Sequence, residues 1–262
     1  MDLRALFSET RPKVGVLPSL EATLTRRVLV IYRADPVVLR RLVPAPLELA
    51  TRNGCAVVGI SLMRLAELRV RGMSSAMGLS AENMAHHAAI RYPAGRALSD
   101  GLFIWRRDTD SPLLAQLGGR LVPAEFRQAS FAFREGTSMA AEIRTERHEA
   151  DVSFVATPDR YWRSTPIFRT REDACEFCCA CECVFSCAWR DRRLFATRLP
   201  ASPWEMTPLR ILRLRSAFFE SPKIFPKGSI AFDSAVLLHS TAEQREDPPC
   251  DAGLAGHVAA AA

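Results

Sequence analysis

Asp100-Gly-Leu-Phe-Ile-Trp-Arg-Arg-Asp-Thr-Asp110 is an apolar run that ends in two adjacent arginines flanked by acids. Alternation along a β-strand predicts two faces, one with Leu102, Ile104 and Arg106 and the other with Phe103, Trp105 and Arg107. One arginine is therefore expected to point into whatever the sheet encloses. Ser111-Pro112 behind the run predicts the cap of a short helix over residues 113–117.

The rest of the chain repeats this strand pattern. Asn53-Gly54 between two apolar runs predicts a two-residue hairpin, and Asp35 followed by Pro36 predicts the start of a short helix. A further helix is expected over 171–180. Strands are expected at 26–33, 55–63, 82–92, 126–135, 138–148, 152–157, 184–189, 193–197, 206–215 and 229–238.

About a dozen strands with a few short helices, and no strand–helix–strand rhythm, predict an α+β fold that is mostly β. The expected architecture is a mostly antiparallel closed barrel or layered cone, which holds a ligand in its interior. We expect one domain over 21–242, an irregular lead-in over 1–20 and a disordered tail over 243–262.

Composition narrows the class of protein. The chain of 262 residues is 48% hydrophobic and 24% charged, which is typical of a globular protein. Its net charge is +6, but the basic residues are scattered, so we expect no nucleic-acid partner. The sequence has no secretory signal and no apolar stretch long enough to span a bilayer, which predicts a cytoplasmic protein without a membrane partner.

Six of the eight cysteines lie between residues 175 and 187. Cys175, Cys178 and Cys179 have the spacing of one helix face, which favours a core stripe of reduced thiols. The alternative is a zinc or iron site, because four thiolates so close together can chelate if the helix ends early. A second paired arm is missing, so we expect no metal and no cofactor.

The Arg106-Arg107 strand resembles the acetoacetate decarboxylase-like superfamily, in which a Lys-Lys pair ends the corresponding strand. The segments 32–35 and 42–47 carry the second part of this resemblance, which covers roughly residues 20 to 240 and is strongest to an uncharacterised YqjF-like branch (a domain of unknown function). The resemblance implies the superfamily's fold. Its Schiff-base chemistry requires a nucleophilic lysine, whereas an arginine stays charged and offers only donors.

Several residues are candidates for a site. Arg106 and Arg107, grouped with Trp105 and Asn83, are expected to bind a small anionic organic ligand; the alternative is a structural ion pair at the strand end with Asp108 and Asp110. The resemblance suggests Glu82 as an acidic residue of the pocket. His86 is a candidate general acid/base or a structural histidine, and His87 is expected on the opposite face. Asp233 is left open as a surface or pocket carboxylate.

Two hypotheses of function follow. The first is a decarboxylase-like enzyme that binds a small oxo- or hydroxy-carboxylate and uses acid/base and arginine electrostatics, lyase-like or isomerase-like, without a Schiff base. The second is a non-catalytic ligand-binding or interaction protein on the same fold. A titratable group within hydrogen-bond reach of Arg106 discriminates between them. The sequence leaves homo-oligomerisation open.

Overall fold

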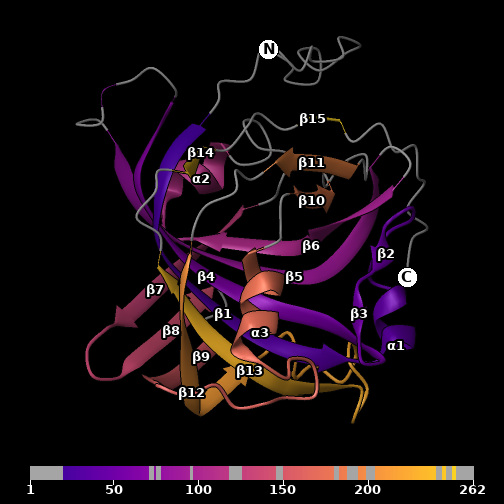
Figure 1. Ribbon diagram of the computed structural model, residues 1–262. Helices are drawn as coiled ribbons and strands as arrows, with labels where there is room; N and C mark the ends of the chain where they lie inside the picture. The colour runs from indigo at the N-terminus through magenta and orange to yellow at the C-terminus, as the bar shows by residue number, and fades with distance from the viewer. Residues whose placement is uncertain are drawn as a thin grey trace.

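The computed structural model describes residues 20–70, 74, 78–94, 97–117, 126–145, 150–179, 183–187, 194–198, 204–239, 244–245 and 250–251. Within these ranges the chain forms one mixed sheet of 15 strands and three short helices, and Figure 1 shows how they are arranged. The strands are β1 (Leu20–Ala34), β2 (Glu48–Leu49), β3 (Thr51–Arg52), β4 (Cys55–Val70), β5 (Leu79–Ala94), β6 (Ala97–Thr109), β7 (Phe126–Arg134), β8 (Met139–Thr145), β9 (Ala150–Pro158), β10 (Cys183–Cys187), β11 (Leu194–Arg198), β12 (Glu205–Ser216), β13 (Ile230–His239), β14 (Gln244–Arg245) and β15 (Cys250–Asp251). The helices are α1 (Pro36–Arg40), α2 (Pro112–Leu117) and α3 (Arg171–Cys179).

Nine of the described strands pair in a closed ring, in the order β6, β7, β8, β9, β12, β13, β1, β4 and β5, with the antiparallel pairing of β5 and β6 completing the circuit. The mostly β class is as predicted, and β7, β8 and β9 form an antiparallel meander. The ring is mostly antiparallel, but β6 runs parallel to both β7 and β10.

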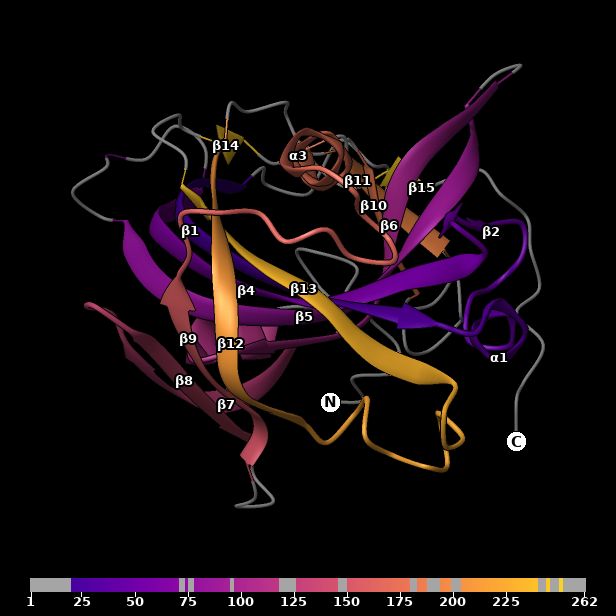
Figure 2. The ribbon, with the colours of Figure 1, turned by 60° about the horizontal axis from the view of Figure 1, so that its bottom comes forward.

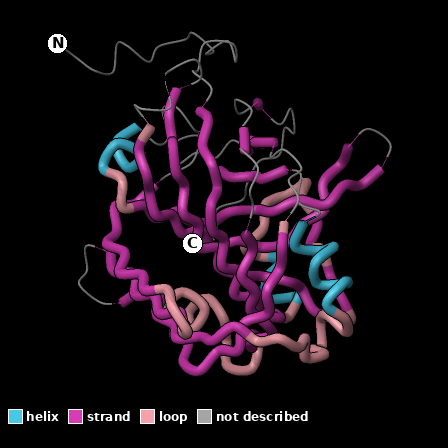
Figure 3. Tube along the Cα trace, turned by 60° about the vertical axis from the view of Figure 1, so that its left-hand side comes forward, coloured by secondary structure: helices cyan, strands magenta, loops and turns pink. Residues whose placement is uncertain are grey.

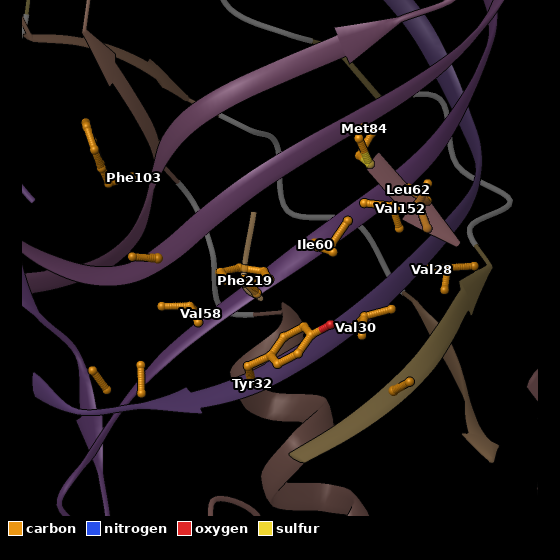
Figure 4. Close-up of a cluster of buried hydrophobic side chains, with 14 of the residues drawn as sticks. Val28, Val30, Tyr32, Val58, Ile60, Leu62, Met84, Phe103, Val152 and Phe219 are labelled. Atoms are coloured by element: carbon orange, nitrogen blue, oxygen red, sulfur yellow. The ribbon is translucent and has the colours of Figure 1, made fainter. Parts of the chain in front are cut away.

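The ring separates two apolar layers. Inside it, side chains from all nine strands form the main core, and Figure 4 shows part of it around Val58, Ile60 and Tyr32. Outside it, the other face of β1, β4, β5 and β13 packs against α3 and Phe168. In Figure 2, α3 lies on the far side of β1 and β4 from β7, β8 and β9, and Figure 3 shows the helices at the periphery of the strands.

Local sequence signals account for the short elements. Asp35 caps α1 by accepting a hydrogen bond from the backbone nitrogen of Val37 at 2.8 Å, with Pro36 in the first turn. Asn53 and Gly54 form the hairpin turn with φ angles of 50° and 78°, the left-handed values that such a turn requires. Both predictions are confirmed because each depends on residues adjacent in the chain.

The structure describes four residues of the tail. In the tail, β14 pairs with β1 and β15 pairs with β11, and the predicted disorder over 243–262 stays a prediction. The remaining tail residues and the lead-in before Leu20 lie outside the described residues. In the part of the chain that the structure describes, no helix is long and apolar enough to cross a membrane.

Candidate active site

A β-bulge at Trp105 decides which arginine points inward. Across β5 and β6, His86 pairs with Arg106 and His87 pairs with Ile104, so Trp105 is an extra residue with no partner of its own. A bulge reverses the alternation beyond it, because two residues on one strand oppose one on its neighbour. The predicted face shared by Leu102, Ile104 and Arg106 is therefore wrong.

Arg106 lies on the inner face of the ring. Its partner His86 packs against Phe218 and Phe219 of the interior, and paired residues of antiparallel strands share a face. Arg107 pairs with Ala85, which belongs to an apolar cluster on the other face, and its guanidinium lies 5.6 Å from the ring of Phe126. The bulge thus separates two adjacent arginines onto opposite sides of the sheet.

Two carboxylates hold Arg106 in place. Asp108 accepts a hydrogen bond from Nε at 2.9 Å and pairs with Nη2 at 2.8 Å, and Asp151 of β9 accepts from Nη2 at 3.0 Å. The side chain of Asp108 is fully buried, whereas those of Arg106 and Asp151 are 14% and 20% exposed. The hydrogen bonds of Arg106 to described residues use Nε and Nη2, and Nη1 makes none to them. Of the ion pair that the sequence suggested, the part with Asp108 exists and is buried in the ring, whereas Asp110 accepts a hydrogen bond from the backbone nitrogen of Glu82.

The two carboxyls differ in acidity. Burial raises the pKa of Asp108 to about 6, although Arg106 opposes this shift. The second oxygen of Asp108, Oδ2, is buried without a hydrogen-bond partner among the described residues. For Asp151, burial is outweighed by hydrogen bonds from Thr145 and Arg106, which hold the pKa of this carboxyl below its usual value. Asp108 can therefore exchange a proton near neutral pH, while Asp151 stays ionised.

His86 is a neutral imidazole in this environment. It is completely buried, and neither ring nitrogen has a hydrogen-bond partner among the described residues. Burial, reinforced by the charge of Arg106, lowers the pKa of His86 to about 3. With its pKa lowered in this way, the imidazole of His86 offers a neutral donor and acceptor beside Arg106. A role of His86 as general acid/base stays a prediction.

Aromatic side chains form the wall around these groups. Trp105 donates from Nε1 to the backbone oxygen of Leu42 at 2.7 Å, and its ring lies 5.6 Å from that of Phe218. Phe219 lies 4.6 Å from the ring of Tyr32 and close to His86, as Figure 4 shows for the first two. This hydrogen bond fixes the orientation of the indole ring of Trp105, which packs against Phe218 in the interior.

Glu82 lies away from Arg106. Its carboxylate pairs with Arg26 at 2.6 Å and with Arg64 at 3.1 Å. Arg26 also stacks on Phe133, with 3.5 Å from its guanidinium carbon to the ring centre. Glu82 and His86 are four residues apart on one strand, which is roughly 13 Å. The structure therefore places Glu82 in an ion-pair cluster separate from the site.

Two further candidates lie elsewhere. Asn83 pairs with Thr109 on the outer face of β5, and its amide nitrogen donates to the backbone oxygen of Ala81 at 3.4 Å. Asp233 has a fully buried side chain that accepts hydrogen bonds from the backbone of Ile167 and the hydroxyl of Ser234. Neither residue lies with Arg106.

The described lysines and the cysteines of α3 lie away from Arg106. Lys223 and Lys227 are exposed in the segment between β12 and β13, and Lys13 lies outside the described residues. Cys178 is the buried cysteine of α3, and the sulfurs of Cys175 and Cys179 are 3.9 Å apart. Within the described ranges, no group of three or more histidine, cysteine or acidic side chains has the geometry of a metal site.

Sequence reasoning missed Asp151, Phe218 and Phe219. Asp151 reaches Arg106 from 45 positions away in the chain, across β9, and no local pattern marks it. The two phenylalanines follow β12, in the segment between the predicted strands 206–215 and 229–238, where no pattern in the sequence marks them as part of a site. A single signal was present for the site, the Arg106-Arg107 pair, and the bulge beside it has no sequence signature.

Solved structures with the same fold include decarboxylase-like enzymes. Acetoacetate decarboxylase from Legionella pneumophila aligns with a TM-score of 0.55 at 14% identity, covering 90% of this chain and 94% of that one. The acetoacetate decarboxylase-like enzyme from Sphingomonas wittichii RW1 aligns with a TM-score of 0.57 at 14% identity, over 91% and 97% of the two chains. The enduracididine biosynthesis enzyme MppR, complexed with pyruvate, aligns with a TM-score of 0.56 at 12% identity, over 93% and 91%.

At these identities the likeness shows the fold alone, and this is the fold that the resemblance to the acetoacetate decarboxylase-like superfamily implied. A search of proteins with curated functions gave no match. A family described as an uncharacterized conserved protein, DUF2071, matches residues 21–240. This chain belongs to the DUF2071 family.

Proposed function

We propose that this protein is an enzyme that binds a small oxo- or hydroxy-carboxylate inside the ring and moves a proton on it by acid/base catalysis. The observation that carries the proposal is the buried Asp108, which is held by Arg106 and has an unpartnered second oxygen. A carboxyl whose pKa is about 6 is suited to give and take protons at neutral pH.

Arg106 supplies the electrostatic part of the proposed mechanism. Nη1 is free of hydrogen bonds to described residues, so it can bind a substrate carboxylate or a developing enolate oxygen while Nε and Nη2 keep Asp108 and Asp151 in place. The side chains of Arg106 and Asp151 are partly exposed, which supports the entry of a ligand from their side of the ring. The neutral imidazole of His86 adds a donor that does not repel the guanidinium.

A Schiff base has no part in this proposal. The described lysines, Lys223 and Lys227, are exposed, and arginine stands where the superfamily carries its nucleophile. The pyruvate bound to MppR supports a small oxo-acid as the ligand class, since that enzyme shares the fold. The proposed reaction is therefore proton transfer at the carbon next to a carbonyl, lyase-like or isomerase-like.

The second candidate is a ligand-binding or interaction protein without catalysis. The observation in its favour is that Asp108 and Asp151 already balance the charge of Arg106, as they would in a structural ion pair. Asp108 distinguishes the two hypotheses, because a binding protein needs no proton donor there.

The test follows exchange of carbon-bound protons for deuterium by NMR. Pyruvate and acetoacetate are incubated in heavy water with the wild type, Asp108→Asn and a control, Asp110→Asn, whose exposed carboxylate accepts from the backbone of Glu82. We expect the wild type to speed exchange with a pH profile that turns near 6, Asp108→Asn to lose this at least about 100-fold, and the control to keep it.

Each other outcome has a meaning. Binding seen by calorimetry without any exchange supports the non-catalytic candidate. Equal exchange by wild type and Asp108→Asn removes Asp108 from the mechanism, and the absence of both binding and exchange with a wider set of oxo- and hydroxy-acids overturns the proposal.

A further inference from the structure

A second buried arginine lies on the outer face of the ring, beneath α3. Arg27 is 8% exposed, and its one hydrogen bond to a described residue runs from Nη2 to the hydroxyl of Ser61 at 3.4 Å. Its Nε is buried with no partner, and no carboxylate among the described residues forms an ion pair with it. The guanidinium is thus largely removed from water and has no counter-charge among the described residues.

His87 completes the polar group. It is 8% exposed, its Nε2 lies 2.9 Å from the hydroxyl oxygen of Ser61, and its Nδ1 has no partner among the described residues. The ring fits because its neighbour across the strands is Gly59, where a Cβ would lie 3.1 Å from Cε1 of His87 and 2.7 Å from the backbone oxygen of Val30. The absence of a side chain at Gly59 therefore makes the room that the imidazole occupies.

The hydrogen bonds fix the direction of the donors. The hydroxyl oxygen of Ser61 accepts from Arg27, so its proton is available to Nε2 of His87, and a neutral imidazole then carries its own hydrogen on Nδ1. Burial, aided by Arg27, keeps His87 neutral by lowering its pKa to about 3. Two buried donors, Nε of Arg27 and Nδ1 of His87, have no acceptor among the described residues.

Arg27 and His87 line a cavity of about 30 Å³, together with Cys178 of α3 and apolar side chains. A second cavity of about 70 Å³ shares Ala89, Leu102 and Phe177 with the first, and its lining includes the charged residues Arg52, Asp100 and Glu176. A single water needs on the order of 10–15 Å³, so the inner space suits one monatomic ion or two waters and excludes a larger acid.

Charge selects between these occupants. An arginine cannot lose its proton in a protein, and an isolated buried charge is costly unless an opposite charge accompanies it. Cys178 does not supply that charge, because burial raises the pKa of its thiol to about 12. Water would satisfy the two donors but leave the guanidinium unbalanced.

We infer that this cavity binds a small monovalent anion of the halide class between Arg27 and His87. The arginine supplies the charge, Nε of Arg27 and Nδ1 of His87 donate to the ion, and the apolar walls favour a weakly hydrated ion such as chloride or bromide. The inference concerns the outer face of the ring and is independent of the proposed reaction inside it.

The test measures thermal stability and ion position in the full chain. The protein is exchanged into sulfate buffer, and bromide is titrated at constant ionic strength while the melting temperature is followed. Because a ligand that binds only the folded state stabilises it, we expect a rise of about 5 °C or more once bromide exceeds its dissociation constant about 100-fold. A crystal soaked in bromide should show an anomalous peak between Arg27 and His87.

Three variants separate this site from a general salt effect. Arg27→Met removes the charge, so it should melt higher than the wild type in sulfate and show no response to bromide. His87→Phe keeps a ring beside Gly59 but removes the Nδ1 donor, and it should bind bromide at least about 10-fold more weakly. Arg210→Met changes an exposed arginine of β12 and should respond like the wild type.

Two results would overturn the inference. One is the same bromide response in wild type, Arg27→Met and Arg210→Met, which would show a nonspecific ion effect. The other is a crystal at saturating bromide in which the cavity contains water and no anomalous peak. If Arg27→Met does not fold, His87→Phe and the anomalous map decide the question.

Discussion

His86 and His87 are neighbours in the chain, yet β5 sends them into two different environments. His86 lies inside the ring with Arg106, Asp108 and aromatic rings. His87 lies outside it with Arg27 and Ser61, under α3. Each environment pairs a neutral histidine with a buried arginine.

The two environments differ in how the arginine charge is balanced. Arg106 has two carboxylates of the protein itself, and burial raises the pKa of one of them, Asp108, to about 6. Arg27 has a hydroxyl and an imidazole, which carry no charge. The inner arginine is therefore neutralised by carboxylates of the protein, whereas the outer arginine has only uncharged partners among the described residues. Four experiments examine this difference.

Acid should produce the largest effect on the free energy of unfolding, because both histidines bind a proton more readily in the unfolded chain than in the folded protein. Their folded-state pKa values lie below the unfolded value, so their stabilisation is present above pH 6.5 and is lost as pH falls toward 3. Between pH 7 and pH 4 we expect a loss of about 3 kcal/mol per histidine. Asp108, whose folded pKa is raised, works in the opposite direction and returns about 2 kcal/mol over the same range.

Urea unfolding of wild type, His86→Leu and His87→Leu at pH 7 and pH 4 measures this. Each replacement should remove its own share of the acid sensitivity. His87→Leu should also cost about 1 kcal/mol at pH 7, because it breaks the bond to Ser61, which His86 does not have. An unchanged pH dependence in either variant would show that the corresponding histidine is not buried as a neutral group.

The second experiment compares Arg106 with Arg107, which the bulge places on opposite faces. Arg106→Met should weaken binding of an anionic ligand such as pyruvate by about 2 to 5 kcal/mol, because a charged hydrogen-bonding partner is lost. Arg107→Met, on the outer face, should cost about 1 kcal/mol or less. Calorimetric titration of the two variants measures both losses of affinity. An equal or larger loss for Arg107→Met would show that the ligand binds on the outer face of the ring.

The third experiment looks for covalent chemistry. Treatment with borohydride in the presence of acetoacetate should leave the intact mass unchanged, because the two described lysines are exposed and lie outside the ring. Borohydride without the keto acid is the control. A mass increase that maps to Lys13, Lys223 or Lys227 would show that a lysine forms a Schiff base with the keto acid, and it would contradict the proposed acid/base role of Asp108.

The smallest effect is expected at the cysteines. If Cys175, Cys178 and Cys179 are packing residues of the outer layer, protein purified without added metal should contain less than one zinc or iron per chain, and a chelator should leave its melting temperature unchanged. Elemental analysis and a melting curve check this. A tightly held metal, released only on unfolding, would reverse the interpretation and change the electrostatics around Arg27.

Local signals in the sequence determined much of the fold. Asp35 with Pro36 and Asn53 with Gly54 were sufficient for the helix start and the hairpin, because their hydrogen bonds and φ angles involve adjacent residues. The alternation of apolar residues was sufficient for the strands, since a two-residue period follows from strand geometry. The arginine pair indicated the region of the candidate site, because two adjacent charges at the end of an apolar run are visible in the sequence itself.

The tertiary structure alone decided how the site is assembled. The bulge at Trp105 arises from the pairing of β5 with β6, so alternation within β6 could not show which arginine faces inward. The resemblance suggested Glu82 as an acidic residue of the pocket, but its carboxylate forms an ion pair with Arg26, which lies 56 positions earlier in the chain. Asp151 reaches Arg106 only because the ring closes, and the burial that sets the pKa of Asp108 exists only in the packed interior. Charge balance depends on neighbours in space, which the order of residues along the chain does not specify.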